Sequence, residues 1–200
     1  ETLLSRLLLW TGLTYLVLSA MWPRYVALFL PGLPSINAQR IANLLLTLLV
    51  VYALFVPSEF RRTLYASIER HKWMWGAFGL MVLMKVLSVV VSASPFGSLY
   101  QLINESYVHM ICLPLGVYMA ADAGRLRSMS KVFYWTLVAT AIIGAVEYLV
   151  KGNLFARFVD PSNDYVAWAI SNKMRGASYR SQSTFGHPLV FGEYAVLAFC

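Results

Sequence analysis

Long apolar blocks, each close to the length of a membrane-spanning helix, are the feature that most restricts the fold of this chain. A helix needs about 20 mostly apolar residues to cross the ~30 Å hydrocarbon core of a bilayer. Such blocks occur at about 7–22, 41–56, 73–91, 103–121, 132–150 and from 187 onward. Only 12% of the residues are charged and the mean hydropathy is +0.63, whereas about a quarter of a soluble domain is charged. The sequence therefore predicts an all-α, polytopic transmembrane helical bundle with about six spans.

All the expected spans belong to one membrane domain, residues 1–200, which we interpret as the front part of a longer protein. The chain begins at Glu1 and not at a methionine, and Cys200 falls inside an apolar run that has not ended. The first span is followed by others and lacks a small-residue cleavage site. We therefore interpret it as a helix and not as a removable signal peptide.

Three polar or broken segments separate the spans. Residues 23–40 contain three prolines and Gly32, which predicts a short surface or re-entrant segment instead of a spanning helix. Residues 58–72 interleave four Lys/Arg with apolar side chains, a pattern typical of a basic helix that lies on an anionic membrane surface. Residues 151–186 are expected to form a long polar loop before the sixth span.

The charges of the short connections set the expected orientation, because cytoplasmic loops carry an excess of Lys and Arg. The segment after the second span holds four such residues. A short loop after the fourth span holds Arg125, Arg127 and Lys131, and the turn at 92–101 holds none. This pattern predicts a cytoplasmic amino terminus and puts the 151–186 loop on the outer face. That loop still carries five Lys/Arg, and cations at an outer face commonly bind an anion.

Several classes of function are not expected. The net charge of +7 comes without an aromatic RNA-binding motif, so orientation signals and anionic membrane lipids explain it better than nucleic acid. Cys112 and Cys200 lie in apolar runs and show neither disulfide nor metal-ligand spacing. The sequence contains no P-loop, GxGxxG, HExxH or Asp-x-Asp motif. We therefore expect no metal, no cofactor and no chemistry that depends on soluble nucleotides.

The densest group of polar residues adjoins the start of the sixth span, in RGASYRSQSTFGHPLVFGE at 175–193. Polar groups at the mouth of a membrane helix are costly unless they are used. Arg180 is the strongest candidate for binding an anion, because a guanidinium matches two phosphate oxygens at once. The alternative is an arginine that reaches lipid headgroups. Arg175 and Gln182 are expected to share this anion site, as is Arg40 at the mouth of the second span.

His187 and Glu193 are the candidates for acid–base chemistry. His187 precedes Pro188, and proline suits the first turn of a helix, so the imidazole is expected near a helix start. There it either donates to a substrate and moves a proton, or only caps the helix. Glu193 lies within the sixth span and needs a partner at that depth. Glu147 and Lys151, four residues apart at the outer end of the fifth span, are interpreted as a structural pair.

A second group of charges is expected inside the bundle. Lys85 falls near the middle of the third span, and Ser88 and Ser92 follow it at helical spacing. This polar stripe should face the bundle interior or a wet cavity. Glu105 and His109, one turn apart in the fourth span, are placed to meet it. Two interpretations of these charges remain open, a structural ion pair and a functional one.

Two stretches of the sequence resemble one family of bacterial membrane proteins. The run RSQSTFGHP at 180–188, with Gly192 four residues on, resembles the opening of the O-antigen ligase and polymerase family. The earlier stretch at 22–41, WPRY…LPGLP…QRI, is similar to its exopolysaccharide polymerase-type members. The motifs are short. They cover the front half of such a protein, and the series of about six spans agrees with it.

The resemblance implies a metal-independent glycosyltransferase of the bacterial inner membrane. Such an enzyme takes a glycan from an undecaprenyl-diphosphate carrier at the periplasmic face. A ligase gives it to lipid A-core, and a polymerase gives it to another carrier-bound unit. Arg180 matches one of the family's arginines that hold the diphosphate. Because family members carry further arginines and a histidine in their second half, the catalytic base is expected beyond Cys200.

Two other classes of function stay open on the residues alone. A transporter or flippase for an anionic or lipid-linked solute would use Lys85, Glu105 and Arg180 as charges along its pathway, and paired broken helices would favour it. The sequence has one broken segment and no internal repeat. A membrane sensor or assembly subunit would use the outer loop only to bind a partner.

Overall fold

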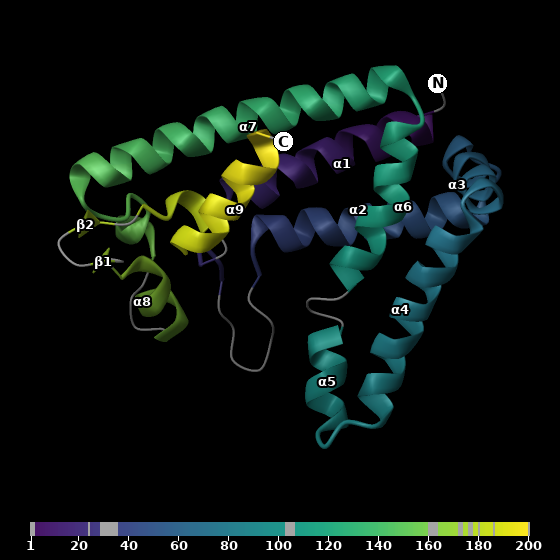
Figure 1. Ribbon diagram of the computed structural model, residues 1–200, viewed down its shortest axis with the longest axis horizontal. Helices are drawn as coiled ribbons and strands as arrows, with labels where there is room; N and C mark the ends of the chain where they lie inside the picture. Colours follow the sequence, from purple (N-terminus) through teal and green to yellow (C-terminus); the bar gives the residue numbers. More distant parts are fainter. Residues whose placement is uncertain are drawn as a thin grey trace. The chain divides into compact units, whose positions relative to one another are not determined.

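The computed structural model describes residues 3–23, 25–28, 36–102, 107–159, 164–171, 174–175, 178–179, 181–185 and 187–199. The helices are α1 (Leu3–Met21), α2 (Ala38–Phe55), α3 (Glu59–Arg70), α4 (Lys72–Val90), α5 (Pro95–Gln101), α6 (Tyr107–Ala120), α7 (Ala123–Val150), α8 (Asp164–Ile170) and α9 (Pro188–Phe199), as Figure 1 shows. Two single-turn 3-10 helices, η2 (Ala156–Phe158) and η3 (Ser183–Phe185), and two short antiparallel strands, β1 (Met174–Arg175) and β2 (Ser178–Tyr179), lie after α7.

The chain is an all-α helical membrane protein. Among the described residues, four helices are long and apolar enough to cross a bilayer: α1, α2, α4 and α7. They correspond to the first, second, third and fifth expected spans. The fourth and sixth expected spans contain the shorter apolar helices α6, with 14 residues, and α9, with 12 residues.

The chain divides into two compact units. The first comprises Glu1–Gly12 and Asn43–Leu126, and the second comprises Leu13–Ala42 and Arg127–Cys200. Helices α1, α2 and α7 each contribute residues to both. Each unit is described by itself below.

In the first unit, α1 and α3 pack against α6. A Cβ added to Gly12 of α1 would meet the Met119 Cε atom at 2.8 Å, so the absence of a side chain allows this close approach. Phe60 at the start of α3 is buried and lies edge-on to the Tyr118 ring, with 5.3 Å between the ring centroids. Ser58 caps α3 by accepting from the Arg61 backbone N–H at 3.1 Å.

A polar cluster fixes the same end of the first unit. Arg125 at the start of α7 is buried, and its Nη1 donates to Glu59 Oε1 at 2.8 Å. Ser5 of α1 donates to the other carboxylate oxygen at 3.1 Å, and the Arg125 guanidinium lies 4.0 Å from the Tyr118 ring centroid. Burial raises the pKa of Glu59, but the hydrogen bonds from Arg125 and Ser5 and the charge of Arg125 outweigh it, so the pKa is lowered overall from 4.5.

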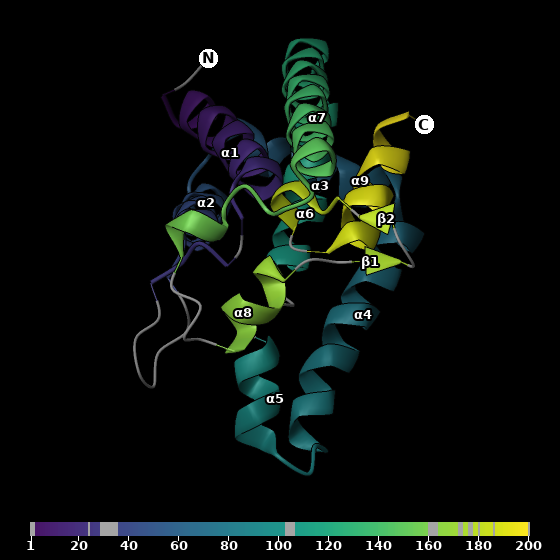
Figure 2. The same ribbon diagram turned by 90° about the vertical axis from the view of Figure 1, so that its left-hand side faces the viewer.

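Two connections differ from the sequence-based expectation. The predicted loop with Arg125, Arg127 and Lys131 is wrong, because α7 already begins at Ala123. Asp122 Oδ1 accepts from the Arg125 backbone N–H at 2.9 Å, as an N-cap does. The predicted turn at 92–101 contains the helix α5, which runs alongside the end of α4 in both Figure 1 and Figure 2.

The second unit has its own small apolar core beside the expected broken segment. Tyr25 and Val166 are buried together, with partly buried Val26, Phe155, Val159 and Ile170 packed around them. The Tyr25 hydroxyl and the Asn153 side chain are hydrogen-bonded, with an Asn153 Nδ2 to Tyr25 Oη distance of 3.0 Å. Leu28 and Ile36 form an isolated antiparallel bridge. Of the predicted broken segment at 23–40, the described residues 23, 25–28 and 36–37 are non-helical, as its prolines predict, whereas residues 38–40 already belong to α2.

Candidate functional site

The candidate site of the second unit is built on a carboxylate in α7 that holds the 181–185 segment. Glu147 is fully buried. Its Oε2 atom accepts from the backbone N–H groups of Gln182 at 3.1 Å and Ser183 at 2.6 Å, and lies 3.3 Å from the Ser181 hydroxyl. Consecutive backbone N–H groups that converge on one anion form a strong, geometrically fixed contact. Glu147 therefore fixes the backbone at the start of η3.

Hydroxyl groups extend this attachment along the segment. Ser181 donates to the Gly144 carbonyl at 2.7 Å, and Ser183 donates to the Thr140 carbonyl at 2.9 Å, so both bind the α7 backbone. Thr184 donates to the carbonyl of Ala20 in α1. Ser183 has a φ of 50°, a left-handed conformation that is costly for a residue with a side chain. These contacts hold the segment in that conformation.

Aromatic contacts connect the segment to α9. The Phe185 ring lies 5.1 Å from the ring of Tyr194, and the Phe133 ring of α7 lies 5.3 Å from the same ring, both between centroids. The Tyr194 hydroxyl is 2.8 Å from the Thr136 hydroxyl. The 181–185 segment, α7 and α9 thus share one set of contacts inside the second unit.

His187 lies at the start of α9, as its position before Pro188 predicts. Its Nδ1 accepts from the Leu189 backbone N–H at 3.3 Å, which is a capping contact. The half-buried ring stacks on Trp168 of α8, with 6.0 Å between centroids and 13° between planes. When Nδ1 accepts and the ring is neutral, the proton is on Nε2, which is then a donor.

The remaining residues proposed for the anion site have different surroundings. Arg180 lies outside the described residues. The backbone of Arg175 forms β1 opposite Ser178, and its side chain is outside the described part. Gln182 is fully buried, so in this conformation its side chain does not face solvent. Arg40 lies half-buried in the first turn of α2, where Asn37 caps the helix by accepting from the Arg40 N–H at 2.8 Å.

The residues proposed for cavity and acid–base roles are only partly described. Lys85 is half-buried in α4, whose residues are all described and include none that is buried, and Ser88 donates back to the Lys85 carbonyl at 2.7 Å. Glu105 lies outside the described residues, as does the side chain of His109, whose backbone belongs to α6. Glu193 is exposed on α9.

Glu147 is the residue of this site whose role the sequence analysis missed. The expected pairing with Lys151 is not formed within the described residues, where Lys151 is exposed with a φ of 55° and the carboxylate accepts from the backbone N–H groups of Gln182 and Ser183. The available signal was a carboxylate within an apolar run, which needs internal partners. No group of three His, Cys, Asp or Glu side chains suited to a metal occurs in the described part of the chain.

Comparison with known proteins adds no relative. No protein-family model, curated protein or solved structure matches this chain.

Proposed function

We propose that this chain belongs to a membrane glycosyltransferase that transfers a glycan from an undecaprenyl-diphosphate carrier to an acceptor. The proposed location is the periplasmic face of the bacterial inner membrane, and the proposed acceptor is lipid A-core or another glycan. One observation supports the proposal: residues 181–183 of the RSQSTFGHP run are anchored to α7 and Thr184 is anchored to α1, with an arginine directly before this part of the run and a histidine after it.

The anchored segment suits the chemistry of a departing diphosphate. Breaking the bond between the glycan and the carrier leaves negative charge on the diphosphate, and cations fixed in advance stabilise that charge. Arg180 directly precedes Ser181, whose hydroxyl is bound to the Gly144 carbonyl. An arginine beside a fixed residue loses less freedom on binding phosphate than one in a free loop. In this proposal Arg180, with Arg175, binds the diphosphate.

His187 has the second role in the proposal. Its Nδ1 faces the α9 backbone, which leaves Nε2 as the atom for a substrate. We assign Nε2–H to a hydrogen bond with the donor glycan or its diphosphate. Glu193 and Arg40 are secondary candidates in this proposal.

Glycan transfer by the full-length protein tests this function. The protein is reconstituted in liposomes with an undecaprenyl-diphosphate oligosaccharide and candidate acceptors, without added metal, and products are resolved on gels. We expect transfer by the wild type, a loss of 100-fold or more, on the order of 2.7 kcal/mol of transition-state stabilisation, in Arg180→Ala, and partial activity in Arg180→Lys. A product ladder identifies a polymerase, and a single step identifies a ligase.

Arg157→Ala is the matched control, because Arg157 is an exposed arginine of the same 151–186 loop. It should transfer glycan as the wild type does. The site assignment is overturned if Arg180→Ala, folded and inserted, matches Arg157→Ala. The function is overturned if the wild type transfers glycan to no acceptor, and uptake of anionic solutes is then the next assay.

A further inference from the structure

Helix α3 lies between two helices that are apolar enough to span a membrane, but is itself too short and too charged to do so. α2 ends at Phe55, α3 covers 12 residues from Glu59 to Arg70, and α4 begins at Lys72. Because both of its neighbours are candidate spans, α3 must lie at the membrane face where α2 ends and α4 begins. A helix in that position borders the lipid headgroups.

One side of α3 is fixed to the first unit. Phe60 is buried against Tyr118, and Glu59 is bound by Arg125. Farther along the helix, Ser67 accepts from the indole Nε1 of Trp75 at 3.1 Å. These contacts along α3 decide which side is left uncovered.

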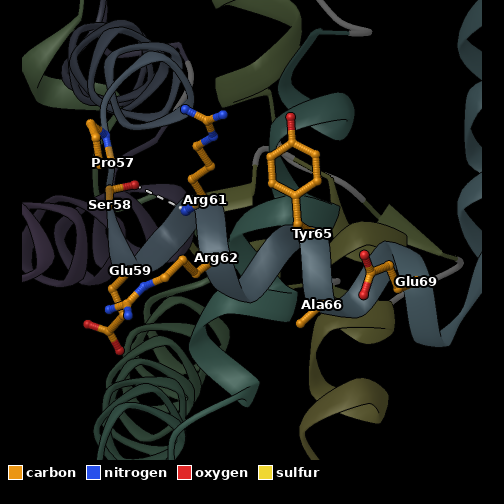
Figure 3. A pocket seen from close by; sticks show the side chains of 8 residues that line it. All are labelled: Pro57, Ser58, Glu59, Arg61, Arg62, Tyr65, Ala66 and Glu69. Atoms are coloured by element: carbon orange, nitrogen blue, oxygen red, sulfur yellow. Dashed lines mark hydrogen bonds between the residues drawn. The ribbon is translucent and has the colours of Figure 1, made fainter.

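The side of α3 that points away from Phe60 and Ser67 is exposed and basic. The exposed residues Arg62, Tyr65, Ala66, Glu69 and Arg70 follow one another at helical spacing. Arg61 and Tyr65 project to the same side, as Figure 3 shows, with the guanidinium 5.5 Å from the ring centroid. An open hollow of about 1140 Å³ lies along this helix, lined by Arg61, Arg62 and Tyr65 among others.

The internal contacts leave this surface with an excess of positive charge. Arg125 neutralises the Glu59 carboxylate within the first unit. Arg61, Arg62, Arg70 and Lys72 then stand against the single carboxylate of Glu69. Trp73, one residue into α4 from Lys72, is 94% exposed, and tryptophan favours the headgroup level of a membrane.

We propose that α3 is an interfacial helix that binds the anionic phospholipid headgroups of its own leaflet through Arg61, Arg62 and Arg70. The candidate spans α2 and α4 hold α3 at headgroup depth, so α3 can bind headgroups without first being brought to the membrane surface. Each guanidinium can donate two hydrogen bonds to the oxygens of one phosphate group, and the negative potential of an anionic leaflet attracts basic side chains. This role does not depend on the proposed glycan transfer.

Hydrogen exchange of the whole protein in nanodiscs tests the proposal. Amide exchange of α3 peptides is compared between bilayers of phosphatidylcholine alone and bilayers that also contain phosphatidylglycerol, with peptides of α6 as the internal reference. We expect exchange in α3 to slow by roughly tenfold with the anionic lipid. High salt should remove this effect in the wild type, because screening weakens exposed charges.

Variants and a soluble anion separate the possible sources of the effect. The Arg61→Gln/Arg62→Gln/Arg70→Gln protein should lose the slowing, whereas Arg157→Gln, an exposed arginine of the second unit, should keep it. The proposal is overturned if α3 exchanges equally in both bilayers or if the effect survives high salt. It is also overturned if inorganic phosphate added to the detergent-solubilised protein slows α3 as much as phosphatidylglycerol does.

Discussion

At the scale of single residues, Glu147 carries the local structure of the candidate site. Replacing it with alanine leaves the buried N–H groups of Gln182 and Ser183 without their acceptor, at about 1–3 kcal/mol for each unsatisfied donor. We expect Glu147→Ala to lower the free energy of unfolding by about 2–4 kcal/mol. Glu147→Gln keeps an oxygen acceptor and should lose less.

Thermal unfolding of the detergent-solubilised protein measures this effect, with Glu69→Ala as the control because Glu69 is an exposed carboxylate. The expected order of midpoints is wild type and Glu69→Ala, then Glu147→Gln, then Glu147→Ala. An unchanged midpoint in Glu147→Ala would show that another group accepts from the backbone N–H groups of Gln182 and Ser183.

Glu59 makes stability in the first unit depend on pH. Because its pKa is lowered in the folded state, its contribution is fully present above about 4.5 and is lost as the pH falls through the folded pKa. We expect the wild-type unfolding midpoint to fall between about pH 5.5 and pH 3.5 more than that of Glu59→Gln. Parallel curves for the two proteins over this range would contradict the assignment.

At the scale of elements, the apolar blocks were sufficient to predict most helices. The first three expected spans match α1, α2 and α4 closely, because a continuous apolar run has only one way to satisfy its backbone in a bilayer. The predicted start of α7 is nine residues too late (132 against 123), because the prediction assigns Arg125, Arg127 and Lys131 to a loop although Arg and Lys both favour helices. The contacts of the candidate site could not be predicted in the same way. The sequence shows the polar run at 181–184, but its partner Glu147 lies 34 or more residues away, and hydrophobic periodicity does not reveal such pairs.

Asp122 is the residue that sets where α7 begins, and it allows a test at this scale. Asp122→Ala removes the acceptor of the Arg125 N–H and should cost about 1 kcal/mol of stability. Asp122→Asn keeps a side-chain oxygen at the cap and should be near the wild type. Chemical denaturation in mixed micelles compares the three proteins, and equal losses in the two variants would point to the charge of Asp122 instead of its capping contact.

At the scale of the whole molecule, the topology depends on how many times the chain crosses the membrane between α3 and the 151–159 segment. α4 and α7 are long enough to cross, and α7, at 28 residues, is about 42 Å long and exceeds the hydrocarbon core. Its first turns, with Arg125, Arg127 and Lys131, can therefore extend into the headgroups. α6 is about 21 Å long for its 14 residues, so the count depends on whether α6 and its surroundings cross.

Three crossings put α3 and the 151–159 segment on opposite faces, and two put them on the same face. The Lys/Arg excess at both ends of the α4–α6 pair favours three crossings and a cytoplasmic α3. Single cysteines replace Glu69 or Arg157, both exposed, in a protein whose Cys112 and Cys200 are alanines. A membrane-impermeant maleimide applied to spheroplasts should label the cysteine at 157 at once and the cysteine at 69 only after permeabilisation. Equal labelling of both in intact spheroplasts would mean that α6 does not cross. The 151–159 segment and α3 would then face one compartment, and the proposal that glycan transfer takes place at the face opposite α3 would have to be abandoned.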